Sequence, residues 1–432
     1  MNVARIRIWF GVAAAAFGFF VAVGTARAAD SAEDLAKDVQ QLSSITGDDQ
    51  ITAKVREWMK EPEKTDKRLK TAEEILNKDP EKITYNAAVI LARVSAGRKN
   101  YDLGLRFYKL CFDKAKKLKS PNKLAEAFEG QYILLAITKK FDQAEKLCRD
   151  FLELDSEDEK LNNMKVFVLE RLSQVMARQG KVKEALKIAD ELTKESQDSW
   201  YFLKNKALIL HEAGKFEESA TAYQEAIDKL QKFVGKLEEL DKKSDEIQKQ
   251  IQDLNKDAND LHYILSNVYV DLNQVDKAVE QLKIVLKSKP DNPTYNNDLG
   301  YIWADHDMNL DEAEKLIRKA LDEDRKQRKK DADLTNDEDK DKAAYLDSLA
   351  WVLYKKKKYD EAKKIQLEVV KDAEEGNNIE ILDHLADIHM AMGEKKEAIA
   401  VWKKCLEADA NTKREMKRQE EVKAKLKAAE GK

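Results

Sequence analysis

One pattern of large and small residues recurs along most of this 432-residue chain and constrains its fold more than any other feature. In the clearest copy, Leu299 and Trp303 are followed by Ala313, Ile317 and Ala320 at helical spacing. Residues three or four positions apart lie on one helix face, so each copy predicts two amphipathic helices. The small position of the second helix recurs at Gly104, Ala144, Ala185, Ser219, Ala278, Ala313, Ala362 and Ala398.

A short turn is predicted between the two helices of each pair. Gly180, Gly214 and Gly393 stand where the first helix ends, a place at which glycine tolerates a positive φ. An apolar or aromatic residue follows two positions later, as at Val182 and Phe216. No pair can bury its apolar face alone, so we expect neighbouring pairs to stack.

The best-preserved copies resemble the tetratricopeptide repeat, a helix–turn–helix unit of about 34 residues. They contain Leu346-x-x-Leu349-Ala350 and Leu382-x-x-Leu385-Ala386, and the resemblance covers residues 60–410, most strongly 259–406. The repeats resemble those of the tetratricopeptide type found in exported bacterial proteins. The resemblance implies an all-α, right-handed superhelical solenoid of about eight or nine helix–turn–helix repeats. It also implies a concave groove, lined by the first helices, that binds an extended peptide or a helix of a partner.

The composition agrees with a helical solenoid. Charged residues make up 37% of the chain, which has only 14 Gly and 5 Pro to interrupt helices. A single core rarely grows beyond ~250–300 residues, so this length favours several domains or a solenoid. The net charge of −4 offers no basic stripe for nucleic acid, and we expect no nucleic-acid partner.

Residues 1–28 have the features of a cleavable secretory signal. Arg5 and Arg7 precede an apolar run over 8–23, and Ala26-Arg27-Ala28 supplies a small-x-small cleavage site. An uncleaved anchor is the alternative, but the run is shorter than the ~20 residues that a membrane span needs. We therefore expect export from a bacterial cytoplasm, a periplasmic or secreted protein, and no membrane insertion after cleavage.

The whole pattern predicts six segments: 1–28 signal peptide, 29–80 N-terminal helical cap and degenerate repeat, 81–229 repeats, 230–258 heptad helical hairpin insertion, 259–410 repeats with a charged loop insertion at 325–341, and 411–432 C-terminal capping helix or tail.

The insertion at 230–258 is the first of two long gaps between repeats. Its apolar residues alternate at spacings of three and four, which is a heptad pattern. We expect two lengthened helices that pack as an antiparallel hairpin, with a turn near 241–244 and Asp241 or Ser244 as N-cap. The alternative is an exposed coiled-coil arm for a partner or for dimerisation.

The insertion at 325–341 is the second gap and has almost no apolar residues. Such a segment cannot bury enough apolar surface to offset its ordering entropy, which predicts a solvated loop or a helix extension followed by one. A polar clamp for a ligand is the alternative.

The C-terminal segment begins with the capping box Thr412-x-x-Glu415, which predicts a polar helix. We expect Met416, Val422 and Leu426 to face the last repeat, and the many Lys and Arg residues to face solvent. Terminal repeats need a capping helix whose outer face is polar, because no further repeat covers them.

Three cysteines fall on inward positions of second helices. We expect Cys111, Cys148 and Cys405 to be buried free thiols. A disulfide between Cys111 and Cys148 is the alternative in an oxidising compartment.

Motifs of enzyme chemistry are absent from the sequence. It has no phosphate-binding Gly-rich loop, no His-Glu-x-x-His and no Cys-x-x-Cys. His384 and His389 are five residues apart and so do not share a helix face, although Asp383 and Asp387 do. We expect a non-catalytic protein without cofactor or metal.

The resemblance identifies which residues line the groove. Carried over position by position, they are Asn267, Asp271, Asn297, Tyr301, Asp305, Asp347, Trp351, Tyr354, Asp383 and Asp387. This groove is aromatic and acidic, which favours a basic protein or peptide partner. The alternative is that Tyr301 and Trp351 only pack between adjacent first helices. Recognition of a terminal carboxylate is disfavoured, because Tyr263 stands where such clamps carry Lys.

We therefore predict an exported scaffold that binds a protein or peptide along its groove, and the sequence specifies neither the partner nor an oligomeric state. The first alternative is a structural or assembly component of a cell-envelope complex, held through 230–258 or the convex face. The second is an enzyme whose site carries no recognisable motif.

Overall fold

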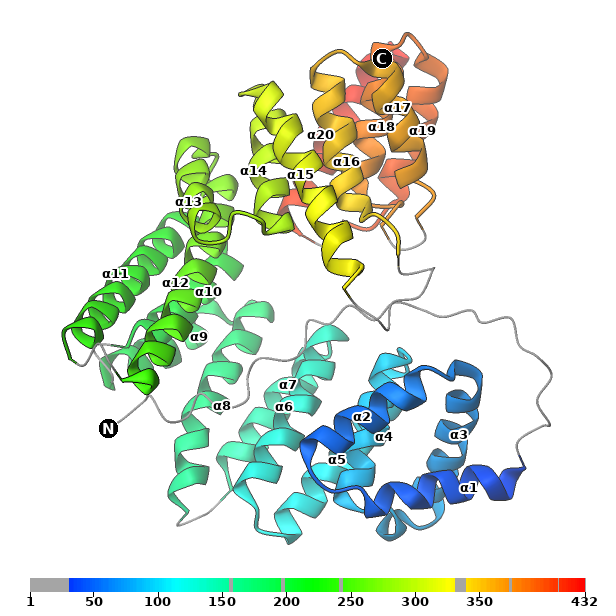
Figure 1. The fold of residues 1–432 in the computed structure, drawn as a ribbon, viewed down its shortest axis with the longest axis vertical. Coiled ribbons are helices and arrows are strands. Elements are labelled where there is room, and N and C mark those ends of the chain that lie inside the picture. The colour runs from blue at the N-terminus through cyan, green and yellow to red at the C-terminus, as the bar shows by residue number, and fades with distance from the viewer. Residues whose placement is uncertain are drawn as a thin grey trace. The chain divides into compact units, whose positions relative to one another are not determined.

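The computed structural model describes residues 31–154, 158–195, 199–240, 244–330, 339–372, 375–410 and 412–431. These ranges contain helices and turns and no strand, which confirms the predicted all-α fold. The chain divides into two compact units, which we call unit 1 (residues 1–194) and unit 2 (residues 195–432). Figure 1 shows the helices of both units in chain order.

Unit 1 begins with helices that precede the regular pairs: α1 (Ala32–Gln41), α2 (Asp48–Met59) and α3 (Pro62–Lys78). The pairs that follow are α4 (Tyr85–Gly97) with α5 (Tyr101–Lys117), α6 (Pro121–Ile137) with α7 (Phe141–Leu152), and α8 (Glu159–Arg178) with α9 (Val182–Glu195). Two short 3₁₀ helices, Leu42–Ser44 and Pro80–Lys82, lie between them.

Unit 2 contains five further pairs and a final helix. The pairs are α10 (Trp200–Glu212) with α11 (Phe216–Leu240), α12 (Asp245–Asp271) with α13 (Val275–Ser288), α14 (Pro293–Asp305) with α15 (Leu310–Arg328), α16 (Ala343–Lys355) with α17 (Tyr359–Val369), and α18 (Ile379–Ala391) with α19 (Lys395–Glu407). The final helix is α20 (Lys413–Glu430).

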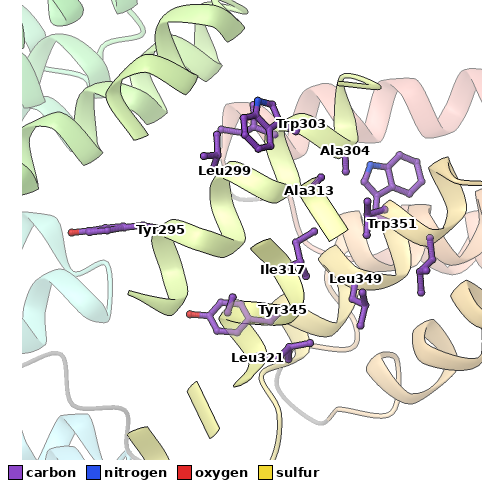
Figure 2. Packing of buried hydrophobic residues seen from close by; sticks show 14 of the residues in the cluster. Tyr295, Leu299, Trp303, Ala304, Ala313, Ile317, Leu321, Tyr345, Leu349 and Trp351 are labelled. Atoms are coloured by element: carbon purple, nitrogen blue, oxygen red, sulfur yellow. The ribbon is translucent and has the colours of Figure 1, made fainter. Parts of the chain in front are cut away.

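The first helices stack on one another as the repeat pattern predicts. In unit 1, α6 contacts α8, and in unit 2, α14 contacts α16, which in turn contacts α18. The apolar residues Leu299, Leu349 and Leu385 are buried with exposed fractions of 3%, 5% and 4%. Figure 2 shows Leu299, Ile317 and Leu349 in one cluster between neighbouring helices.

All eight small positions of the second helices are buried, as predicted. The contact between α14 and α15 shows most clearly why these positions carry small residues. A Cβ on Gly300 would lie 2.7 Å from Cγ1 of Ile317 and 2.9 Å from the backbone oxygen of Ala313. Only a residue without a side chain on α14, opposite an alanine on α15, lets the two helices approach this closely.

The turns within the pairs use a left-handed residue. The prediction for Gly180, Gly214 and Gly393 is confirmed, since their φ values are 79°, 73° and 80°. In other pairs a residue with a side chain takes the same place, such as Lys139 at 54° and Lys357 at 63°. Outside glycine this conformation costs about 1–2 kcal/mol, so these turns are held by the packing of the helices they connect.

The insertion at 230–258 forms parts of two long helices that contact each other, α11 and α12. The predicted N-cap is confirmed at Ser244, whose side chain accepts a hydrogen bond from the backbone N–H of Ile247. Leu237 and Ile251 are buried, whereas Phe233 and Leu240 are exposed. Residues 241–243 lie outside the described ranges.

The charged insertion begins as a helix extension, because α15 continues to Arg328. Nε of Arg325 donates to Asp341 at 2.8 Å, and Nε of Arg328 donates to Asp339 at 3.2 Å. Residues 331–338 lie outside the described ranges, and so does the predicted signal peptide. Among the helices that the structure describes, none combines the length and the apolar character needed to cross a bilayer.

The three cysteines are buried free thiols, as predicted, and Cys111 and Cys148 are not joined. Burial raises the pKa of both Cys148 and Cys405 to about 12. Thiols with such pKa values remain protonated at neutral pH and react slowly, which suits a packing role.

Candidate functional site on the inner face of unit 2

The first helices of unit 2 carry an unbalanced negative charge. Three consecutive ones, α14, α16 and α18, contain a single lysine, Lys355, and no arginine. Their carboxylates are Asp298, Asp305, Asp347, Glu380, Asp383 and Asp387. We call the side of α12, α14, α16 and α18 that carries the predicted groove residues the inner face of unit 2.

The C-terminal helix α20 lies beside α19 and α18 (Figure 1), and its side chains reach carboxylates of this inner face. Its guanidinium at Arg418 contacts Glu380 at 2.8 Å and Asp383 at 3.3 Å. Farther along the helix, Nζ of Lys425 lies 2.9 Å from Asp383 and 2.7 Å from Asp387.

The start of α20 reaches a more distant repeat. Arg414 contacts Asp271 of α12 at 2.7 Å, across 143 residues of sequence. The predicted capping box is confirmed at this end, with Thr412 and Glu415 exchanging their two hydrogen bonds. The predicted open groove is therefore occupied here by the chain's own basic helix.

Of the expectations about α20, one is confirmed in part and one is wrong. Arg414, Lys417, Lys423 and Lys427 are exposed, as expected of its basic residues. Arg418 and Lys425 are instead partly buried, and they pair with carboxylates of the inner face, as Arg414 also does, because the first helices offer those carboxylates almost no cations of their own. Met416 was expected to face the last repeat, yet it is 52% exposed. Six residues separate it from the buried Val422, which turns it about 240° around the helix and away from the core.

Asp383 is the centre of the charge cluster. It is fully buried on α18, where its Oδ1 also accepts a hydrogen bond of 3.0 Å from the indole N–H of Trp402 in α19. Burial and the nearby Asp383 raise the pKa of Asp387, an effect that Lys425 opposes. Burial disfavours a charge on Lys425, but Asp387 and Asp383 outweigh it and raise the pKa of that ammonium. The ammonium of Lys425 is therefore held charged by the two carboxylates, whereas burial and Asp383 disfavour a charge on Asp387.

Trp351 and Tyr301 connect first helices to each other. The indole N–H of Trp351 donates to Asp305 of α14 at 3.1 Å, and its ring stacks on His384 of α18 with centroids 4.0 Å apart. The hydroxyl of Tyr301 donates to Glu380, which is also on α18. Trp351 is only 6% exposed, so the structure favours the packing alternative for this ring over an anchor for a partner.

A buried histidine lies beneath this aromatic layer. Nδ1 of His384 lies 3.0 Å from both carboxylate oxygens of Asp347, which also accepts from Nε2 of Gln366 at 2.5 Å. Burial opposes protonation of His384, yet the charge of Asp347 and its hydrogen bond raise the pKa of the ring above the ordinary value of 6.5. Within the described ranges, Nε2 of His384 has no hydrogen-bond partner.

The remaining predicted groove residues differ in exposure. Asn267 is exposed, and its amide donates to the backbone oxygen of Tyr263 at 3.1 Å. Asn297 is buried and donates to Asp298, while Tyr354 is half-buried and stacks on Trp351. Asp271 also contacts Nε2 of His211 at 2.9 Å.

The structure therefore connects most of the predicted groove residues through groups that the sequence prediction omitted. These are Glu380, His384, Arg414, Arg418 and Lys425. Two signals could have found the basic ones: the shortage of cations on three first helices, and the spacing of four and seven residues between the three basic residues. Within the described ranges, no three His, Cys, Asp or Glu side chains gather closely enough to hold a metal ion.

Comparison with protein families agrees with the helix pairs. Tetratricopeptide repeat models match residues 172–232, 265–328, 343–380 and 379–412. The chain therefore contains tetratricopeptide repeats, and the matches include the whole of α14 to α19 apart from short connections. No curated protein has a significantly similar sequence.

Solved structures of repeat proteins are also similar to this chain. A tetratricopeptide repeat protein from Parabacteroides merdae is 15% identical, with 73% of this chain and 98% of that chain covered and a TM-score of 0.43. A thermophilic TPR protein from Thermus thermophilus is 15% identical, with 54% and 98% covered and a TM-score of 0.36. MamA from Desulfovibrio magneticus is 16% identical, with 48% and 93% covered and a TM-score of 0.34.

Proposed function

We propose that this chain is a non-catalytic scaffold that binds a protein partner through the inner face of unit 2. The observation that carries the proposal is the fit of a basic amphipathic helix, α20, to the carboxylates of that face. A surface that pairs with Arg and Lys at helical spacing has the chemistry to bind a basic segment of another protein.

Two exposed side chains make the inner face accessible beside α20. Asn267 on α12 is exposed, and Met390 on α18 is 41% exposed. A photo-crosslinking amino acid at either position, introduced in cells, should join to the same protein. The matched control is Ala400, an exposed residue of the second helix α19. We expect the crosslinked peptide of the partner to be rich in Lys and Arg.

A charge variant makes this test specific. Asp387→Asn should weaken the crosslinks from Asn267 and Met390, whereas Asp360→Asn, a neutralisation at an exposed site on α17, should not. Equal crosslinking from Ala400, or crosslinked peptides without excess basic charge, would contradict the proposal.

We also propose that the protein is exported through cleavage after Ala28. The support is the order of Arg5 and Arg7, an apolar run and Ala26-Arg27-Ala28. Intact-mass measurement of the protein made in a bacterial host should find a chain that begins at Ala29 in the periplasmic or secreted fraction. A full-length chain in the cytoplasmic fraction would contradict this part of the proposal.

A second function is favoured by the α11–α12 hairpin, namely assembly into a larger complex. Phe233 and Leu240 are 39% and 70% exposed near its end, where a partner could cover both apolar side chains. Phe233→Glu with Leu240→Glu should keep the helical content and release an assembly partner. Unchanged assembly in this variant would exclude the hairpin as the contact.

A further inference from the structure

Two kinds of contact hold α20 on unit 2. Val422, Leu426 and Ala429, in its second half, pack with residues of α18 and α19 in one apolar cluster. Its first half is different, since no side chain from Arg414 to Glu421 is buried. That half contacts the inner face through the ion pairs of Arg414 and Arg418.

Three carboxylates of the inner face take their cationic partners from α20. Across the described residues, every cation that pairs with Glu380, Asp383 or Asp387 belongs to α20. The side chain of Asp383 is 1% exposed and that of Asp387 is 16% exposed. A buried carboxylate that loses its partner is strongly destabilised, so this face requires a cationic occupant.

The contacts of α20 define which occupant fits. Arg414, Arg418, Val422 and Lys425 follow one another at spacings of four, four and three residues, which places them on one face of the helix. Regular helical spacing of the anchoring residues is how an amphipathic helix is recognised in a groove. The site thus distinguishes a basic amphipathic helix from an extended basic peptide, whose side chains alternate with a period of two.

We propose that α20 is a displaceable occupant of the partner site, and that the partner contributes a basic amphipathic helix with the same spacing of cations. This inference rests on the proposed function, because it specifies the partner class and the regulation of the same face. A helix tethered by a short segment such as 408–412 has an effective concentration in the mM range. A partner must therefore compete with α20 for the inner face. Basic segments that match the spacing of the α20 cations poorly bind too weakly to displace it.

The test uses a fluorescent synthetic peptide of residues 412–431 as the probe and the full chain as the receptor. In one variant, Arg414→Glu, Arg418→Glu and Lys425→Glu are combined to release α20 from the inner face. With a peptide affinity near 10 μM, tethering at mM concentration weakens apparent binding to the wild type by about 100-fold relative to this variant. Fluorescence anisotropy measures both affinities.

A matched control has the same change in charge on the other sides of the helix. Lys417, Lys423 and Lys427 are exposed and contact no residue of the first helices. The combined Lys417→Glu, Lys423→Glu and Lys427→Glu variant should bind the probe as weakly as the wild type does. A probe with Gln at the three inner-face cations should bind neither receptor.

A second receptor avoids substitutions within α20. A protease site inserted between Ala410 and Thr412 allows the folded chain to be cut, so that α20 remains with every side chain intact. The labelled peptide should then exchange into the cut chain, and it should exchange faster at high salt because the contacts are ion pairs. Circular dichroism before and after cutting checks that the remaining helices are retained.

The outcomes separate this inference from the proposed function. Tight binding to the released variant, with exchange into the cut chain, supports the inference. If the probe binds neither receptor while Asn267 still crosslinks a basic partner, the inference is overturned and the proposed function stands. If the probe binds but no partner crosslinks on the inner face, α20 is a displaceable cover and the proposed function fails.

Discussion

The carboxylates on the first helices are paired with cations from different sources in the two units. In unit 1, carboxylates and arginines of adjacent first helices pair directly. Arg93 of α4 contacts Glu126 of α6 at 2.9 Å, and Arg171 of α8 contacts Glu129 of α6 at 2.8 Å. In unit 2, α14, α16 and α18 have many carboxylates and one lysine, and the missing cations come from α20.

The distances along the sequence show what this difference means. The two pairs of unit 1 join residues 33 and 42 positions apart, which is about one repeat. In unit 2, Arg418 and Lys425 lie 35 and 42 positions from Asp383, and Arg414 lies 143 positions from Asp271. The two pairs of unit 1 thus join first helices of neighbouring repeats. The cations that pair with Glu380, Asp383 and Asp387 come instead from a helix that follows all the repeats, and another basic helix could replace that helix.

Removal of α20 should have the largest effect and should affect the two units unequally. Truncation after Ala410 leaves Asp383 and Asp387 without cations and exposes the apolar cluster around Trp402. We expect unit 2 to lose about 3–5 kcal/mol, the usual effect of breaking a buried ion pair. Hydrogen exchange should accelerate in α18 and α19 and remain unchanged in α4 to α8. Uniform acceleration throughout the chain would contradict the comparison.

Substitution of one arginine in each unit sharpens the comparison. Arg418→Ala removes the cation that pairs with Glu380 and one of the two that pair with the buried Asp383, and should destabilise unit 2 by about 2 kcal/mol, since Lys425 still contacts Asp383. Arg93→Ala should cost unit 1 no more than about 1 kcal/mol, because Arg93 and Glu126 are both more than one quarter exposed. Urea unfolding followed by hydrogen exchange measures the loss of stability in each variant. Equal losses would show that the ion pairs of α20 contribute no more to stability than the pairs within unit 1.

Stability near neutral pH should vary in unit 2 alone, because all five histidines of the chain follow residue 194. The pKa of His384 is raised in the folded state, where Asp347 of α16, Glu380 of its own helix and Arg418 of α20 surround it. Its contribution to stability is therefore complete below pH 6.5 and is lost as pH rises through the folded pKa. Each pKa unit of difference between the folded and unfolded states corresponds to about 1.4 kcal/mol.

Thermal unfolding of the wild type and of His384→Gln across pH 6–9 measures this effect. The wild type should lose stability toward alkaline pH, and the variant should respond less. If the stability of the wild type increased from pH 6 to pH 9, the predicted contribution of His384 would be contradicted.

The smallest effect is expected in the turns, where both units should respond alike. Lys139→Gly in unit 1 and Lys357→Gly in unit 2 relieve a left-handed backbone at 54° and 63°. Each should stabilise its unit by about 0.5–1 kcal/mol, after the extra freedom of glycine in the unfolded chain is subtracted. Gly393→Ala, at a φ of 80°, is the reverse control and should destabilise. Thermal unfolding checks all three, and a stabilising Gly393→Ala would contradict the argument.

Local pattern predicted the parts of the fold that local physics determines. The burial of Leu299 and Ala313 follows from helical spacing, and the positive φ of Gly180 follows from where its helix ends. The N-cap at Ser244 and the capping box at Thr412 are also encoded within a few residues. For the candidate site, the sequence identified the acidic positions but expected them to face water or a partner.

The sequence by itself determined the helix pairs, their stacking order and the negative charge on the first helices of unit 2, because these depend on spacings of three and four residues. Only the tertiary structure decided that Asp383 is buried, that Trp351 stacks on His384, and that α20 supplies the cations. Those contacts join residues on different helices, about one repeat apart for Lys425 and Asp383 and 143 positions apart for Arg414 and Asp271, and spacings of three and four residues within one helix do not specify them.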